Sequence, residues 1–233
     1  MNAAIMHRNV GRRAVIAAVL GVVLLVPGLA RPVLAASLAE ELVEESRFSI
    51  ERMLKDDELP QLKRYVTNAR ALLIIPELVK GAFIVGAEAG SGVLMVRGND
   101  GTWSPPAFYT LVAGSIGLQI GGQVSEVVFT VMNDGAVEAL LSNEVKLGAD
   151  LSITLGAIGK GLEASTTTNL SADIFAFSKA VGAFGGGALE GAKLFTRKKL
   201  NEEYYGAGAT PRAIVIERGL INPQAENLRR AAP

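Results

Sequence analysis

Acidic and amide side chains in the glycine-rich middle of the chain are the first candidates for chemistry. Glu88, Gln119, Gln123, Asp150 and Glu190 each stand among apolar residues and glycines. A buried polar group without a partner costs about 1–3 kcal/mol, so each needs a ligand or a neighbouring side chain. We therefore expect these residues either to line a cleft for a ligand or to form a network that fixes the register of strands.

Glu88 and Glu190 are the pair that could support catalysis. Glycoside hydrolysis requires two carboxyl groups about 5–10 Å apart, one acting as acid and the other as base or nucleophile. A carboxylate-based hydrolase acting on envelope glycans is therefore one alternative function.

Four basic residues gather after the glycine-rich region, namely Lys193, Arg197, Lys198 and Lys199. Near an anionic membrane each could contribute about 1 kcal/mol of attraction, but the same residues also suit a solvated helix face. Trp103, the single tryptophan of the chain, suits either an interfacial anchor or a core or lid position.

Residues 1–35 have the pattern of a secretory signal peptide. Arg8, Arg12 and Arg13 precede an apolar run over 14–26, and small residues follow near Ala35. The run of 13 residues is shorter than the roughly 20 that span a bilayer. We expect residues 36–233 to be exported and to be periplasmic or peripherally associated with the envelope.

Composition restricts the chemistry of the exported part. The four arginines of residues 1–35 reduce the 23 basic residues to 19 against 23 acidic ones, a net charge of −4 that disfavours nucleic-acid binding. The single histidine, His7, lies in the signal, and the chain has no cysteine. Histidine- or cysteine-based catalytic and zinc sites are therefore excluded, which leaves carboxylate chemistry, a lysine nucleophile, calcium bound by oxygen ligands, or no catalysis. Of these we expect no catalysis, with no cofactor and no metal.

Two N-terminal helices are expected over residues 38–70. Ser37 and Glu40 form a capping box that predicts a helix from Leu38 to about Lys55. Because its charged face is mostly acidic, we expect it to pack on the protein body and not on a membrane. Pro60 predicts a second helix over 61–70.

The region 71–191 contains 20 of the 26 glycines and predicts a twisted sheet. Alternation within 103–123 places Phe108 and Val112 on one bulky face, with Leu111 as an exception. Asp134 is expected to cap a short helix over 136–142. The expected strands are 71–75, 83–88 and 92–97 (a hairpin around 89–91), 103–123, 127–131, 145–155, 163–168 and 173–179.

The segment 193–231 predicts a basic helix after Lys193, a strand over 213–216 and a final helix opened by Pro223. Taken together, the pattern predicts a single α+β domain. Its glycine-rich, mainly antiparallel sheet is twisted, partly closed in the manner of a barrel, and flanked by N- and C-terminal helices.

Several motifs occur in an order that resembles the SYLF domain family: IIPELVKGAFIVGAEAGSGVLMVR (74–97), WSPPAFYTL (103–111), GLQIGGQ (117–123), VMND (131–134), KLGAD (146–150) and GALEGAKL (187–194). The resemblance extends over about 38–221. It implies a single α+β domain that binds membrane phospholipids, with actin-binding adaptors among the eukaryotic members.

A non-catalytic protein that binds phospholipid or an anionic membrane surface is therefore the favoured function. A structural or interaction protein of the periplasm is the other alternative, and the sequence specifies no protein partner.

Overall fold

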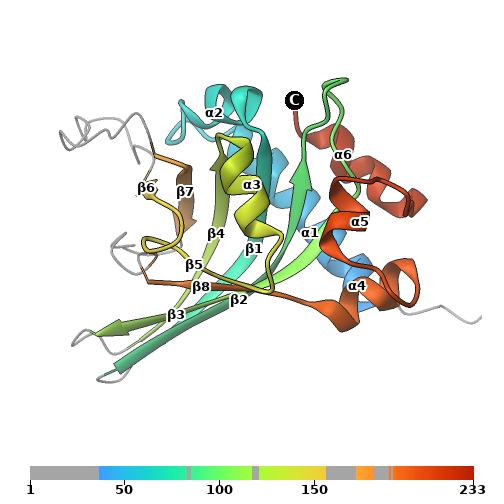
Figure 1. Ribbon diagram of the computed structural model, residues 1–233. Helices are drawn as coiled ribbons and strands as arrows, with labels where there is room; N and C mark the ends of the chain where they lie inside the picture. The colour runs from blue at the N-terminus through green and yellow to red at the C-terminus, as the bar shows by residue number, and fades with distance from the viewer. Residues whose placement is uncertain (1–36, 83–84, 117–120, 156–171, 181–188, 190) are drawn as a thin grey trace, which may run out of the picture. The chain divides into compact units, whose positions relative to one another are not determined.

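An eight-stranded sheet runs through the protein in the order β5-β8-β3-β2-β1-β4-β7-β6. The computed structural model describes residues 37–82, 85–116, 121–155, 172–180, 189 and 191–233. The strands are β1 (Ala71–Ala82), β2 (Val85–Val96), β3 (Ala107–Ile116), β4 (Gly121–Val131), β5 (Glu144–Lys146), β6 (Ile153–Leu155), β7 (Ile174–Ala180) and β8 (Lys193–Thr196). Every neighbouring pair is antiparallel except β6 and β7, and the sheet curls as Figure 1 shows.

A bulge in β1 decides which side chains face which side of the sheet. Ile74 pairs with Val93 but Glu77 pairs with Ser91, so two residues of β1 stand opposite one of β2. The alternation of side chains shifts there, and Ile75 and Leu78 both face the same core. The expectation that Pro76 ends the strand at Ile75 is wrong, because the bulge accommodates a residue without a backbone N–H donor.

The sheet separates two hydrophobic cores. On what we call the outer face, α1 (Leu38–Leu54), α2 (Leu62–Asn68), α4 (Lys198–Tyr205) and α6 (Glu226–Ala231) pack over residues such as Phe108 and Phe177. On the inner face, α3 (Asp134–Leu140) and α5 (Pro211–Val215) pack over Tyr109 and Phe129. In Figure 1, α3 lies in front of the sheet and α1 behind it.

Local capping signals account for the N-terminal helix. Ser37 Oγ accepts a hydrogen bond from the Glu40 N–H (3.2 Å), and Glu40 Oε2 accepts one from the Ser37 N–H (2.9 Å), so the predicted capping box is confirmed. For α3 the cap is Asn133 and not Asp134, because Asn133 Oδ1 accepts from the Ala136 N–H at 2.7 Å.

Four further expectations about elements are wrong. Residues 89–91 form no turn, since β2 is continuous from Val85 to Val96. Residues 145–155 divide into β5 and β6 around Gly148, whose φ is +84°, and Asp150 accepts a hydrogen bond from the Lys146 N–H. Leu111 is no exception, because β3 turns Leu111 with Tyr109 to the inner core and Phe108 to the outer one.

The fourth wrong expectation is the strand over 213–216, which is a helix, α5, because Thr210 caps it and Pro211 occupies its first turn. The basic helix expected after Lys193 is confirmed as α4, and the short strand β8 precedes it. Pro223 opens a 3₁₀ turn, η2 (Pro223–Ala225), that leads into α6, as predicted.

The expected strand over 163–168 lies outside the described residues. The predicted α+β class, with a mainly antiparallel and partly closed sheet flanked by helices, is confirmed. Within the described part of the chain, no helix has both the length and the apolar character that a membrane crossing requires.

Candidate functional site

The outer face carries a row of exposed apolar side chains where the strands extend beyond the helices. Val112 of β3 pairs with Ala89 of β2, Ala89 pairs with Val79 of β1, and Val79 pairs with Val124 of β4. The three valines are 49% (Val79), 40% (Val112) and 45% (Val124) exposed. We call Val79, Ala89, Val112 and Val124 the outer platform. Figure 1 shows the ends of β2 and β3 extending beyond the helices.

The next row of the outer face is made of small residues. Gly114 pairs with Ala87, and Ala87 pairs with Gly81; all three are exposed. Nothing lies within 4 Å of the position where a Cβ would stand at Gly81 or Gly114. The outer platform therefore continues into a low, open surface on which a partner could approach the backbone.

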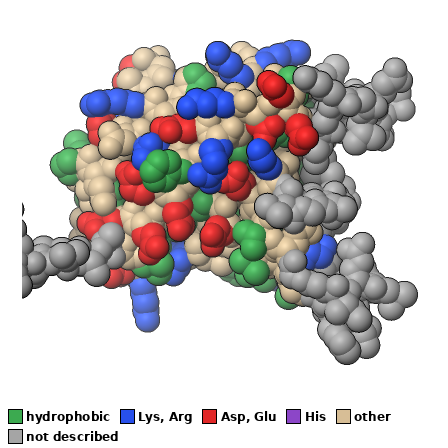
Figure 2. Space-filling model, turned by 180° about the vertical axis from the view of Figure 1, so that it is seen from behind, with side chains coloured by type: hydrophobic (Ala, Val, Ile, Leu, Met, Phe, Trp, Pro, Cys, Tyr) green, Lys and Arg blue, Asp and Glu red, His purple; other side chains and the backbone are tan. Residues whose placement is uncertain are grey.

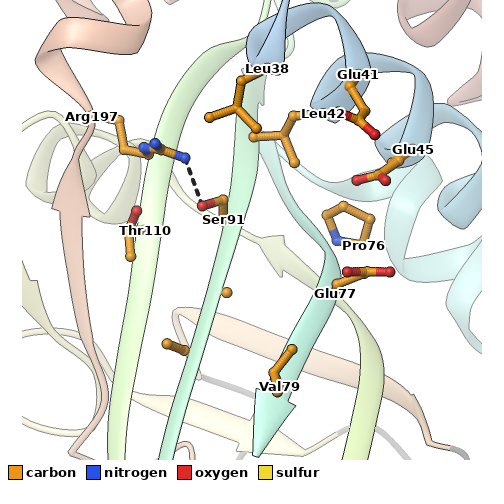
Figure 3. Close-up of a pocket in the computed structure, with 12 residues that line it drawn as sticks. Leu38, Glu41, Leu42, Glu45, Pro76, Glu77, Val79, Ser91, Thr110 and Arg197 are labelled. Atoms are coloured by element: carbon orange, nitrogen blue, oxygen red, sulfur yellow. Dashed lines mark hydrogen bonds between the residues drawn. The ribbon is translucent and has the colours of Figure 1, made fainter.

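A groove of about 430 Å³ separates the outer platform from α1 (Figure 3). We call it the α1 groove. Leu38 and Leu42 of α1 line one side, and Val79 and Ala89 of the outer platform line the floor. Its full lining is Leu38, Glu41, Leu42, Glu45, Pro76, Glu77, Val79, Ala89, Gly90, Ser91, Thr110 and Arg197.

Charges of opposite sign stand on opposite sides of the α1 groove. Glu41 and Glu45 come from α1 and Glu77 from the bulge of β1, while Arg197 lies across from them between β8 and α4 (Figure 3). Arg197 is held by its N–H, which donates to the Phe108 carbonyl (2.9 Å), and by Nη1, which donates to Ser91 Oγ (2.8 Å). Among the described residues, none of these four groups forms an ion pair.

Burial and like charge act together on Glu45. Partial desolvation raises the pKa of its carboxyl above the ordinary value of 4.5, and the nearby carboxylates of Glu77 and Glu41 raise it further. The groove therefore favours a positive charge beside Glu45.

Glu45→Gln is expected to stabilise the protein at neutral pH. Because the pKa of the Glu45 carboxyl is raised in the folded state, the folded protein holds this proton more tightly than the unfolded chain does. The free energy of unfolding therefore falls as pH rises from about 4.5, the ordinary pKa, through the raised pKa of the folded state. Glutamine removes that loss, so Tm should rise by about 1–2 °C at pH 7 and remain unchanged at pH 4. Thermal unfolding of both proteins at the two pH values measures this; an equal shift at both would contradict it.

A second hollow of about 480 Å³ adjoins the α1 groove, sharing Glu45, Pro76 and Glu77 with it. Its other charges are neutralised within the protein, since Arg52 pairs with Glu126 and Lys179 with Asp56. Phe48 contributes an apolar edge that is 47% exposed. Figure 2, seen from the side of α1, shows acidic, basic and hydrophobic side chains interspersed on this face.

The structure separates the four basic residues that the sequence groups together. Lys193 pairs with Glu144 at 2.8 Å, and Lys198 lies 3.9 Å from Glu202. Lys199 is exposed on α4. Of the four, Arg197 alone lines the α1 groove.

Trp103 lies in the outer core, where its side chain is 3% exposed. Its Nε1 donates a hydrogen bond to the Ala232 carbonyl at 3.2 Å, and the Arg97 guanidinium lies 4.1 Å from the ring centroid. Of the two predicted positions, the core one is therefore observed, and the ring attaches the C-terminus to the sheet.

The polar strand residues face the inner side of the sheet. Lys80 is paired in register with Glu88 on β2 and with Gln123 on β4. Glu88 is fully buried, and Lys80 Nζ lies 3.0 Å from its Oε1. Gln119 and Glu190 lie outside the described residues, so the Glu88–Glu190 pair stays a prediction.

The sequence alone did not indicate the three glutamates of the α1 groove or its valine, Val79. In the sequence, Glu41 and Glu45 belong to the acidic face of the expected N-terminal helix, and Val79 lies between the expected strands 71–75 and 83–88. The alternation in PELVKGA, with a proline before it, is the signal that could have indicated an outward-facing strand end after a bulge.

Comparisons with known proteins agree on one family. The family model described as "Ysc84: Las17-binding protein actin regulator" matches residues 112–232. The chain is 31% identical over 169 residues to Protein YSC84 of Saccharomyces cerevisiae, covering 71% of this chain and 36% of that protein. It is 35% identical over 141 residues to human SH3 domain-containing YSC84-like protein 1, covering 60% of this chain and 41% of that protein.

LAS seventeen-binding protein 3 of Saccharomyces cerevisiae is 31% identical over 166 residues, which are 70% of this chain and 36% of that protein. The chain thus spans well under half the length of these curated relatives, one of which is named as a binding protein. On the family model, which covers more than half of the chain, and on these relatives, the predicted membership is confirmed: the chain belongs to the Ysc84, or SYLF, family.

Proposed function

We propose that this protein is a non-catalytic phospholipid-binding protein that sits peripherally on a membrane of the cell envelope. The outer platform is the observation that carries this proposal. Valines on β3, β1 and β4 are each exposed by 40–49% on the outer face, in one row with Ala89 of β2. Contiguous exposed apolar side chains of this kind mark interaction surfaces.

The surroundings of the outer platform suit a membrane interface. Leu38 and Phe48 of α1 add apolar side chains that are 54% and 47% exposed. Lys193 stands in register with Val112 and pairs with Glu144, and Lys179 lies on β7 beyond β4 and pairs with Asp56. Pairs of opposite charge therefore flank the platform on both sides, as polar groups flank the apolar part of a membrane-binding surface.

A protein partner is the second candidate. The family model and one yeast relative are named for binding Las17, so a protein ligand is the function that their names favour. The same outer platform would serve it. Binding to protein-free vesicles separates the two candidate functions, because phospholipid binding requires it and protein binding does not.

Sedimentation of residues 36–233 with phospholipid vesicles tests the proposal. Replacing Val79, Val112 and Val124 together with threonine keeps strand-forming residues but removes apolar area. Burying these half-exposed valines in the membrane is worth about 2 kcal/mol in total, so the triple variant should bind at least about tenfold more weakly.

The matched control replaces Ile216 and Ile221, which are 42% and 76% exposed and do not line the α1 groove, with threonine. The control should bind as the wild type does. The proposal fails if the wild type binds no vesicles, or if the platform variant and the control bind equally well.

A further inference from the structure

We infer that the α1 groove recognises a zwitterionic phospholipid headgroup, in which an ammonium group lies next to the phosphate. This inference rests on the proposed function and deepens it by naming the class of lipid. The headgroups of phosphatidylethanolamine and phosphatidylcholine have this chemistry. It replaces the expectation of an anionic surface held by a basic cluster, because the structure brings only Arg197 of that cluster to the groove.

The acidic side of the α1 groove suits an ammonium group. Glu41, Glu45 and Glu77 line it together, and among the described residues no cation pairs with them. Glu45 is partly buried and is disfavoured as an anion by the other two. An ammonium group placed beside them would therefore relieve repulsion that no cation of the described segments compensates.

The basic side of the α1 groove suits a phosphate group. Arg197 uses Nη1 for Ser91 and its backbone N–H for Phe108, which fixes the side chain at the edge of the groove. Within the part of the chain that the structure describes, its other guanidinium N–H groups have no hydrogen-bond partner and can bind phosphate oxygens, for which a planar, two-pronged donor is well suited. The two sides thus match the two charges of one headgroup.

The outer platform provides an apolar surface for the acyl chains of the lipid. Val79 and Ala89 belong both to the floor of the α1 groove and to the outer platform. A lipid whose headgroup occupies the groove can extend its acyl chains along the exposed valines without crossing a charged rim. An anionic headgroup in the same place would bring phosphate toward three unpaired carboxylates, with one arginine in compensation.

Vesicles that share acyl chains and differ only in headgroup test this inference. Wild-type residues 36–233 should bind phosphatidylcholine or phosphatidylethanolamine vesicles about tenfold more tightly than phosphatidylglycerol vesicles. Replacing Glu41, Glu45 and Glu77 with glutamine should abolish that preference by weakening zwitterionic binding. Arg197→Gln should weaken binding to both classes, because both contain phosphate.

The charge-matched control replaces Glu58, Glu203 and Glu217 with glutamine, since these exposed residues lie outside the groove. The control changes net charge equally and should keep the preference. If it loses the preference as the groove variant does, general charge and not the groove is responsible, and the inference is overturned.

The two proposals fail in distinguishable ways. If the wild type binds vesicles through the outer platform but equally well for all headgroups, or prefers phosphatidylglycerol, the headgroup inference alone is wrong. If no vesicle is bound, the proposed function itself is wrong.

Discussion

Gly92→Ala is expected to destabilise the protein by about 3 kcal/mol or more, lowering Tm by roughly 6–12 °C or preventing folding. A Cβ at Gly92 would stand against the Ile74 carbonyl oxygen and Ile75 Cδ1, closer than the 3.0 Å that real Cβ atoms respect. The carbonyl belongs to the backbone and cannot turn away. The bulge of β1 would have to move instead.

This strain would also reach the candidate site. The bulge at Ile75–Glu77 directs Glu77 into the α1 groove and turns Val79 to the outer platform. Gly90 has the same role on the other side of the bulge, since a Cβ there would lie 2.5 Å from the Glu77 carbonyl oxygen. We therefore expect any Gly92→Ala protein that does fold to bind vesicles less well than the wild type.

Gly114→Ala and Gly81→Ala are the matched controls, on β3 and β1 of the same sheet. Neither added methyl group meets an atom within 4 Å, so the free energy of unfolding should be unchanged or slightly higher. Thermal and urea unfolding of the three variants decides the matter. A Gly92→Ala protein as stable as the two controls would show that the bulge adapts, contrary to this account.

Elements whose signals are local could be predicted from the sequence. Helix α1 begins where the Ser37–Glu40 capping box predicts, because both hydrogen bonds join residues three apart. Strand β7 and the final helix after Pro223 also occur where expected. Together with these local signals, the family motifs predicted the α+β class.

Elements that depend on contacts between distant segments could not be predicted. β1 continues through Pro76 because β2 and β4 pair with it on both sides of the bulge. Residues 213–216 are too short an apolar run for periodicity to distinguish a strand from a helix. In the structure they belong to α5, which Thr210 caps and which packs against β2 and β3.

The candidate site shares this limitation. Glu41 and Glu45 stabilise the start of a helix in any context, and nothing in their spacing indicates Glu77 or Arg197 as neighbours. The glutamates of α1, Glu77 of β1 and Arg197 after β8 come together only because α1 packs over the bulge and β8 pairs with β3. Charge patterning within one segment therefore suggested an anionic partner, whereas the assembled groove indicates a zwitterionic one.

Lys80→Met is expected to destabilise the protein by about 3–5 kcal/mol, because it would leave a carboxylate buried without a counter-charge. Glu88 is fully buried, and among the described residues the Lys80 ammonium at 3.0 Å is its ion-pair partner. Neither Glu88 oxygen accepts a hydrogen bond of normal geometry from those residues. Nothing else on the described part of the inner face compensates this charge.

The double variant Lys80→Met/Glu88→Leu should regain most of the lost stability, since replacing both partners of a buried pair with apolar side chains is often neutral. Urea unfolding of the wild type, both single variants and the double variant gives the coupling energy. A double variant no more stable than Lys80→Met would show that Glu88 has other partners.

The same double variant decides between the two roles that the sequence left open for Glu88. If Glu88 only fixes the register of β1 and β2, the refolded double variant should bind vesicles as the wild type does, because the α1 groove and the outer platform lie on the opposite face. If Glu88 lines a ligand site, binding should be lost although stability is regained. We expect the first result, since Glu88 is already paired across the sheet with Lys80.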